Sequence, residues 1–465
     1  MLTYDLERRG SLARYDYLYR CIKEDIVSGR LAAGEKLPSK RALARHLETA
    51  VVTVENAYAQ LSAEGYLRPE EKRGYFVCPV EVRPDRPTAA ETRPRQAAPQ
   101  RRWLLDMTSG GSGTEGFPFS VWARLMRRVI TEEGERLMRS LPHSGALPLR
   151  QALARHIYQF RGIAADPEQI VVGAGTEYLY SVLIQLLGRQ WGYAVEDPGY
   201  LRLSKIYEKN DVVTYHIPMD QAGIIPEKLE ESGAEILHIT PSHHFPTGIV
   251  MPVSRRYEFL SWASKGENRY IIEDDYDCEF RLAGRPIPTL QSIDVMEKVI
   301  YINTFSKSLA PAFRISYLVL PKHLVTRFYE TLGFYSGTVS CLEQMTLARF
   351  LSEGYFEKHI NRMRNHYRAL RDKLLLALRQ SPLAGRVKIS EEHAGLHFLL
   401  ELDTQRSDEE ILQAAQAQDL RISFVSQYYV AAQNRRPHVL VMNYSGLEEE
   451  KVEEAVSRLC RAVLG

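Results

Sequence analysis

Lys307 follows a β-rich run in the stretch YINTFSKSLAPAFRISYLVLP, residues 301–321. A lysine at the end of a buried strand is costly unless it is paired, neutralised or covalently modified. Thr304 and Ser306 bring hydroxyl groups close to it, and Arg314 brings a guanidinium fork suited to a phosphate. A desolvated lysine beside another cation has a lowered pKa and condenses readily with an aldehyde. The stretch therefore predicts a site for pyridoxal 5′-phosphate (PLP), which carries both an aldehyde and a phosphate.

The alternative is an ordinary surface lysine that lies along the protein and extends its ammonium group into water. An acidic cluster elsewhere in the chain favours the cofactor site, because a pyridinium nitrogen needs an acidic partner. The stretch YIIEDDYDCEF places Glu273, Asp274 and Asp275 at the end of a predicted strand, and Tyr276 follows as a hydrogen-bond partner for a ring oxygen. An isolated acidic cluster is more often a solvated turn, so residue type alone leaves the three carboxylates equivalent.

Two further stretches meet other requirements of the same cofactor. VVGAGTEYLYSVL is typical of a strand, a glycine-rich turn and a helix, which offers backbone N–H groups to a phosphate near Gly175 and Thr176. Many such turns contain two glycines, so this pattern is weak by itself. VEDPGYLRL places Tyr200 on a Pro-Gly turn, from which its ring could cover the face of the cofactor.

The elements that must position these groups begin after a separate N-terminal module, residues 1–78. Helical spacing predicts a first helix that stops at Ser28-Gly29, a second that starts after Ser39 as N-cap, and a third that ends at Gly65. Two short strands follow around a charged turn at residues 70–74. Three helices and a β-wing are typical of a winged helix-turn-helix, and the alternative is a small helical dimerisation module.

A linker and a large module complete the chain. Residues 79–102 contain five prolines, six arginines and no aromatic residue, which predicts an extended tether. Residues 103–465 alternate strand-like and helical segments, which predicts an α/β domain around a parallel sheet. A smaller C-terminal α/β subdomain is expected from about residue 330.

Composition limits the classes of protein to consider. Apolar residues make up 45% of the chain and the net charge is +2, as in ordinary globular proteins. No apolar run is long enough to span a membrane, and the N-terminal stretch MLTYDLERRG has no signal core. The five cysteines are scattered without CxxC pairs, which favours reduced thiols over disulfides or a metal site. We therefore expect a cytoplasmic protein without a metal and without a membrane partner.

The N-terminal module resembles the DNA-binding domain of the GntR family of bacterial regulators, through SGRLAAGEKLPSKRALARHLETAVVTVENAYAQLSAEGYL and KRGYFV. The resemblance implies a double-stranded DNA operator as partner. It implies DNA contacts from five residues: Ser39, Arg41, Thr53, Lys72 and Arg73. Val51 and Val52 stand where the family usually places a polar or basic residue. Apolar groups can touch a thymine methyl group but cannot read guanine.

From GFPFSVW near Phe117 to its end, the chain resembles a fold-type-I aminotransferase. The whole combination resembles the MocR/GabR-type regulators, which join a GntR-like domain to an aminotransferase-like domain through a long linker. The resemblance implies Lys307 as the aldimine lysine, Asp274 at the pyridine nitrogen, Tyr276 at the ring hydroxyl and Tyr200 stacked on the ring. It implies a phosphate site made by Gly175, Thr176, Thr304, Ser306 and Arg314. Arg202 and His243 are the candidate contacts of an amine or amino-acid effector, and a head-to-tail homodimer is expected.

Two departures from the aminotransferase pattern bear on function. Phe245 falls where aminotransferases have an asparagine that donates to the ring hydroxyl, and Val441 falls where an arginine usually grips the substrate carboxylate. Arg435 and Arg436 are close enough in sequence to replace that arginine. The resemblance therefore predicts a PLP-binding transcriptional regulator that senses an amine effector, or PLP itself, through Lys307, with weak transaminase turnover at most. The alternatives are an active aminotransferase with an appended DNA-binding domain, and a DNA-binding protein whose large domain binds no cofactor.

Overall fold

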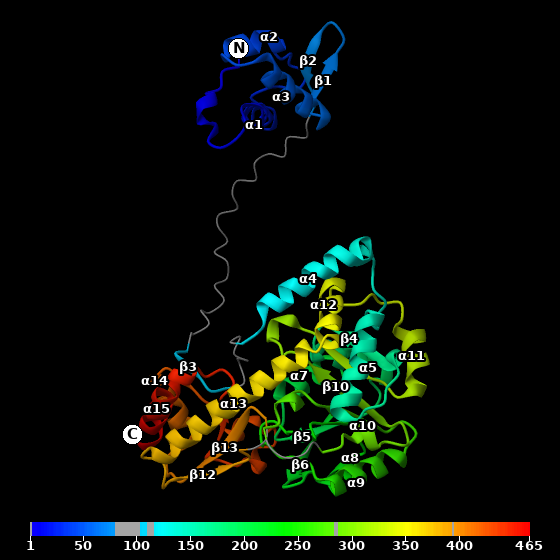
Figure 1. Ribbon diagram of the computed structural model, residues 1–465, viewed down its shortest axis with the longest axis vertical. Coiled ribbons are helices and arrows are strands. Elements are labelled where there is room, and N and C mark those ends of the chain that lie inside the picture. Colours follow the sequence, from blue (N-terminus) through cyan, green and yellow to red (C-terminus); the bar gives the residue numbers. More distant parts are fainter. Residues whose placement is uncertain (1, 80–102, 109–115, 283–286, 393–394) are drawn as a thin grey trace. The chain divides into compact units, whose positions relative to one another are not determined.

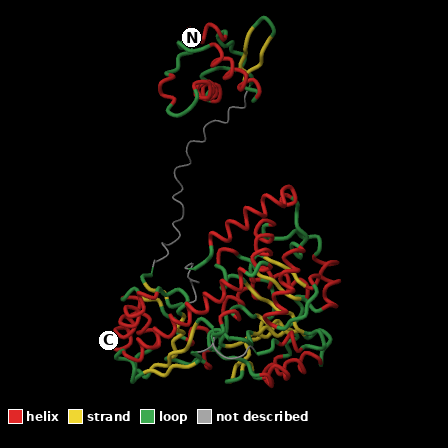
Figure 2. Tube along the Cα trace, viewed as in Figure 1, coloured by secondary structure: helices red, strands yellow, loops and turns green. Residues whose placement is uncertain are grey.

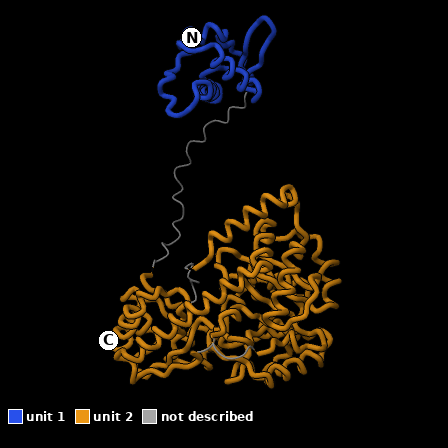
Figure 3. The backbone as a smooth tube through the Cα atoms, in the orientation of Figure 1, with its two compact units in different colours: residues 1–101 blue, residues 102–465 orange. Residues whose placement is uncertain are grey.

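The computed structural model describes residues 2–79, 103–108, 116–282, 287–392 and 395–465. The chain divides into two compact units, residues 1–101 and 102–465 (Figure 3). Apart from Pro79, the predicted linker lies outside the described residues, so the domain boundaries at its two ends stay predictions. Within the described ranges, no helix combines the length and the apolar character needed to cross a membrane.

The small unit has the predicted winged helix-turn-helix plan. Its elements are α1 (Arg14–Val27), α2 (Lys40–His46), α3 (Val51–Ala63), β1 (Leu67–Glu70) and β2 (Gly74–Val77). Leu18 and Ile22 of α1 pack against Val54 and Tyr58 of α3 in one buried core, because these residues recur at helical spacing on facing sides. The strands β1 and β2 pair antiparallel as the wing.

The large unit is built on an eight-stranded sheet (Figures 1 and 2). Its order is β4 (Ile170–Gly173), β11 (Ser316–Val319), β10 (Val299–Thr304), β9 (Tyr270–Asp274), β8 (Ile236–Ile239), β5 (Tyr193–Asp197), β6 (Thr214–Asp220) and β7 (Gly223–Ile224). The five strands from β10 to β6 are parallel, whereas β11 runs antiparallel to both β10 and β4. The sheet is therefore mixed rather than parallel. The connection from β10 to β11, residues 305–315, is too short for the helical crossover that a parallel neighbour requires.

Helices cover both faces of this sheet. Ile236 and Ile272 point to the face covered by α6 (Thr176–Leu187) and α11 (Lys322–Leu332). Leu237 and Ile271, each one position away along its strand, point to the face covered by α8 (Pro226–Ser232) and α9 (Val253–Ser264). Successive side chains of a strand alternate between faces, so strands buried on both sides are apolar throughout.

The C-terminal part forms the expected smaller α/β subdomain. The antiparallel sheet β12 (Val387–Ser390), β13 (His397–Leu402) and β15 (Val439–Asn443) packs with α13 (Tyr355–Gln380), α14 (Asp408–Ala417) and α15 (Val452–Leu464). β3 (Leu105–Asp106) pairs with β14 (Leu420–Arg421), which joins the start of the large unit to its end. Further helices of this unit are α4 (Phe119–Glu133), α5 (Leu147–Arg161), α7 (Leu201–Lys209), α10 (Leu290–Ile293) and α12 (Cys341–Ser352).

Candidate functional site

A cavity of about 510 Å³ lies where the large sheet brings its strand ends together. The parallel strands β5, β8, β9 and β10 end at one edge, and β11 begins there because it runs in the opposite direction. The cavity is lined by nine residues predicted from the sequence: Thr176, Tyr200, Arg202, Asp274, Tyr276, Thr304, Ser306, Lys307 and Arg314. The topology of the sheet therefore brings residues that are far apart in the chain together around one cavity.

One end of the cavity is suited to a phosphate. Helix α6 begins at Thr176, so its first backbone N–H groups and its positive dipole end face this region. Gly175 is its N-cap, with a φ of +95°, and a Cβ there would lie 2.6 Å from Arg314 Nη2. Both the backbone conformation and the close approach of Arg314 thus require glycine. Thr304 donates a hydrogen bond of 2.9 Å to Ser306, which orders the hydroxyl groups nearby.

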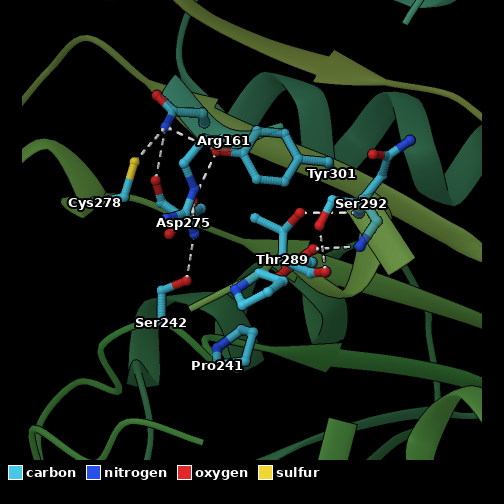
Figure 4. A network of polar contacts seen from close by, with 12 residues as sticks. Arg161, Pro241, Ser242, Asp275, Cys278, Thr289, Ser292 and Tyr301 are labelled. Atoms are coloured by element: carbon cyan, nitrogen blue, oxygen red, sulfur yellow. Dashed lines mark hydrogen bonds and ion pairs between the residues drawn. The ribbon is translucent and has the colours of Figure 1, made fainter. Parts of the chain in front are cut away.

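The structure distinguishes the three carboxylates that residue type alone left equivalent. Glu273 is fully buried, 3.4 Å from Arg256 Nη1, and accepts hydrogen bonds from two backbone N–H groups of α10. Asp275 is also buried and lies 2.8 Å from Arg161 Nη2, while Tyr301 donates to it at 2.8 Å (Figure 4). Both carboxylates therefore have structural partners away from the cavity.

Asp274 points into the cavity instead. Its Oδ2 accepts a hydrogen bond from Tyr180 and lies 3.5 Å from His238 Nε2. His238 is held in turn by Tyr207, whose hydroxyl lies 2.6 Å from Nδ1. The other carboxylate oxygen, Oδ1, is buried and has no hydrogen-bond partner among the described residues. A buried acceptor without a donor is costly, so this oxygen fits the N–H of a bound pyridinium ring.

Lys307 and Tyr276 lie on the wall beside Asp274. Burial lowers the pKa of Lys307, and the negative charge of Asp277 acts in the opposite direction. Burial also raises the pKa of Tyr276, which keeps its hydroxyl protonated. His243 does not line this cavity: its Nδ1 lies 2.7 Å from Asp277 Oδ2 and 3.4 Å from the Tyr276 hydroxyl. The predicted effector contact from His243 would therefore be indirect, through Asp277 or Tyr276.

The two departures from the aminotransferase pattern share one apolar cluster. Val441 is 2% exposed and packs with Leu399, Val425 and Val439, and Phe245 packs against the same group. Phe245 also lines the cavity, so an apolar ring occupies that part of its wall. A guanidinium or amide group placed in this cluster would lose its water without gaining partners there.

Neither arginine suggested as a replacement lines the cavity. Arg436 is exposed and lies 2.9 Å from Glu401 Oε2, and Arg435 lines a separate surface groove. That suggestion is not supported.

Arg421 lines the cavity and was not singled out from the sequence. It lies on β14, and two residues later the backbone carbonyl of Ser423 accepts a hydrogen bond from the N–H of Val441 at 2.9 Å. Its Nη1 lies 3.1 Å from Asp106 Oδ2. A single arginine in a short strand carries no motif, so only the pairing of β14 with β3 and its approach to β15 reveal it.

Glu196 is a second residue of the cavity that no sequence pattern indicated. It lies on β5, lines the cavity and accepts a 2.7 Å hydrogen bond from the Thr240 hydroxyl. Burial raises the pKa of Glu196 to about 8, since the charged form loses water that Thr240 only partly replaces.

In the small unit, the predicted DNA contacts lie at the starts of α2 and α3 and at the wing. The Ser39 hydroxyl accepts a 3.2 Å hydrogen bond from the Ala42 N–H and so caps α2, and Arg41 beside it is exposed. Thr53 is half-buried in the first turn of α3. In the turn between β1 and β2, Lys72 is exposed, whereas Arg73 Nη1 lies 2.6 Å from Glu70 Oε2.

Val51 and Val52 open α3 and are 42% and 61% exposed. Apolar side chains with this much exposure are not needed for the core of the small unit, which uses Val54, Ala57 and Tyr58 of the same helix. They are placed where a recognition helix presents its first residues.

Comparison with known proteins agrees with this architecture. Residues 14–77 match the family model of bacterial regulatory proteins, gntR family. Over 98% of both chains, the protein is 38% identical to the uncharacterized HTH-type transcriptional regulator YdeL of Bacillus subtilis. It is 30% identical to the probable rhizopine catabolism regulatory protein MocR of Rhizobium meliloti, over 99% of this chain and 95% of that one.

A solved structure shows the fold of the large unit. The kynurenine aminotransferase of Pyrococcus horikoshii superposes with a TM-score of 0.67 and 23% identity, covering 78% of this chain and 91% of that one. With the full-length relatives, this similarity establishes both halves of the architecture. The chain therefore belongs to the MocR-type subfamily of GntR-family transcriptional regulators, with an N-terminal helix-turn-helix domain and an aminotransferase-like domain.

Proposed function

We propose that this regulator binds PLP through Lys307 and uses the bound cofactor to sense a small amine or amino acid. The observation that carries the proposal is the cavity itself. Lys307, the guanidinium of Arg314 and Asp274 Oδ1, which has no partner in the described part of the chain, all face this one space. When bound, PLP supplies an aldehyde that condenses with primary amines. The GntR-type domain binds an operator in double-stranded DNA.

The residues of the cavity suit each part of the cofactor. Asp274 would accept a hydrogen bond from the pyridinium N–H, because Oδ1 is buried and lacks another donor among the described residues. Arg314 and the first N–H groups of α6 would bind the phosphate. Tyr200 lines the cavity beside them and offers an aromatic face, and Tyr276 offers a protonated hydroxyl.

The effector most compatible with the lining is an amine that carries an acidic group. Arg202 and Arg421 both line the cavity and can each hold a carboxylate with more than one N–H donor. To regulate, the ligand must favour one arrangement of the protein by a real difference in affinity. An effector amine that took the place of Lys307 at the aldehyde would supply such a difference, because it would free the amine of Lys307 at the cavity wall.

A regulator is favoured over an aminotransferase by the apolar cluster of Phe245 and Val441. Rapid transamination needs the α-carboxylate and the ring hydroxyl to be held in fixed positions. The side chains of Phe245 and Val441 supply no polar group for either purpose. Sustained multiple turnovers with amino donors and a keto acid would contradict this preference.

As a homodimer in head-to-tail arrangement, two winged helices would read paired half-sites in the operator. Light scattering of the purified protein, with and without a DNA fragment that holds both half-sites, measures this stoichiometry. Two chains per DNA fragment are expected, and one chain per fragment at saturation would contradict the dimer.

The test of cofactor binding is the visible absorbance of the purified protein after incubation with PLP. Wild-type protein is expected to retain the absorbance through gel filtration, and Lys307→Ala is expected to lose it. Lys322→Ala is the matched control, since this lysine is exposed at the start of α11 and does not line the cavity. Retained absorbance in Lys307→Ala would contradict the proposed attachment.

Operator binding is tested with fragments captured from the native genome. Fluorescence anisotropy of such a fragment, measured with and without a panel of amines, is expected to change for amines that also alter the absorbance. If the amines alter the absorbance but never the affinity for DNA, the bound cofactor does not regulate DNA binding.

A further inference from the structure

We infer that Glu177 is an internal counter-anion, which competes with the cofactor phosphate for Arg314 and with the acidic group of the effector for Arg202. The inference rests on the proposed function and concerns how its two ligands influence each other. Glu177 Oε1 lies 2.8 Å from Arg202 Nη1, and its Oε2 lies 3.3 Å from Arg314 Nη2. All three side chains line the same cavity.

Position and charge make Glu177 a competitor rather than a structural support. It is the second residue of α6, so its carboxylate stands at the helix end where a phosphate would bind. Its side chain is 37% exposed, so it lacks the close packing that holds Glu273 and Asp275. The hydrogen bond from Arg202 and the charge of Arg314 lower the pKa of Glu177, which keeps it ionised at neutral pH.

A phosphate at Arg314 brings negative charge close to this carboxylate. Like charges a few ångströms apart repel, and the partly exposed site moderates that repulsion without removing it. The carboxylate then keeps its 2.8 Å contact with Arg202 and gives up Arg314. Cofactor binding would therefore strengthen the ion pair between Glu177 and Arg202, which the effector must break.

Binding of an acidic effector should in turn weaken binding of the phosphate. An acidic effector at Arg202 displaces Glu177 toward Arg314, where the phosphate already is. With both ligands bound, the carboxylate has neither arginine as partner. Phosphate and effector would thus oppose each other through Glu177, and by linkage each lowers the affinity of the other by the same factor.

The experiment compares PLP with pyridoxal, which has the aldehyde but no phosphate. Cofactor-free wild type and Glu177→Gln are titrated with each compound, and binding is followed by visible absorbance. We expect Glu177→Gln to bind PLP about tenfold more tightly at low salt and to bind pyridoxal unchanged. The gain should shrink as salt rises, because screening weakens the repulsion that the variant removes.

Two controls keep the result specific. Glu208→Gln removes an exposed carboxylate on α7, beside Lys209, and should change neither affinity. Butyrate, a carboxylate without an amine, should weaken PLP binding in wild type but not in Glu177→Gln. Thermal unfolding followed by tryptophan fluorescence shows that each variant is folded before it is titrated.

The outcomes separate this inference from the proposed function. Absence of PLP binding in wild type would overturn both. PLP binding in wild type with equal or weaker binding in Glu177→Gln would overturn the counter-anion and leave the proposed function standing. An equal gain for pyridoxal and PLP would also overturn it, since the effect would not depend on phosphate.

Discussion

The same substitution to asparagine is expected to affect different properties at the adjacent carboxylates. At Asp275 it should lower stability, and at Asp274 it should lower the affinity for PLP. Asp275→Asn removes the negative charge from a buried pair in which the side chains of Arg161 and Asp275 are 6% and 1% exposed. Breaking such a pair from one side leaves a buried charge without compensation and costs about 3–5 kcal/mol. The hydrogen bond from Arg161 to Ser242 and the one from Tyr301 place the expected cost toward the lower end of that range (Figure 4).

Asp274→Asn should behave differently because its carboxylate has fewer partners. An asparagine at this position keeps an oxygen that accepts from Tyr180, and no arginine of the described ranges is paired with Asp274. We expect the free energy of unfolding to change by about 1 kcal/mol or less. PLP affinity should fall instead, because a neutral amide cannot stabilise the pyridinium charge.

Urea unfolding followed by tryptophan fluorescence measures the stability difference. The chain has four tryptophans, at positions 103, 122, 191 and 262, so the signal reports on the large unit alone. Visible absorbance with PLP measures the binding difference in the same samples. A loss of stability in Asp274→Asn as large as that in Asp275→Asn would refute the assignment of the two roles, as would normal PLP binding by Asp274→Asn.

Three further predictions concern other parts of the molecule. Arg421→Gln should weaken the spectral response to 4-aminobutyrate severalfold and leave the response to butylamine unchanged; equal effects on both amines would exclude a carboxylate contact. Burial raises the pKa of Glu196 to about 8, above about 4.3 in the unfolded chain, so the folded state holds a proton that the unfolded state has lost. Stability should therefore fall by up to about 1.4 kcal/mol per pH unit between these values, and Glu196→Gln should show a flatter melting temperature from pH 5 to 8. Lys72→Ala should lower the salt dependence of DNA binding by about one ion, and more than Arg73→Ala does, because Glu70 already pairs with Arg73; anisotropy at several salt concentrations measures both slopes.

Local patterns were sufficient to predict the small unit. The stop at Ser28-Gly29, the N-cap at Ser39 and the stop at Gly65 all correspond to observed boundaries. Each of these signals acts within a few residues, so no long-range contact is needed to interpret it.

The antiparallel strand β11 was not predicted, because strand direction depends on the connection and on the neighbour. An apolar run such as SYLVL has the same composition in either orientation. The short connection from β10 is what excludes a crossover, and its consequence is that Arg314 arrives at the same edge as Lys307.

Sequence by itself determined the two-part organisation, the helix-turn-helix and the residue types that suit a phosphate and an aldehyde, because these depend on spacing and chemistry along the chain. Tertiary structure decided what keeps Glu273 and Asp275 out of the cavity, that Arg421 joins it and that His243 does not line it. Those outcomes depend on strand register and on partners such as Arg161 and Arg256, which come from distant segments and satisfy Asp275 and Glu273 elsewhere.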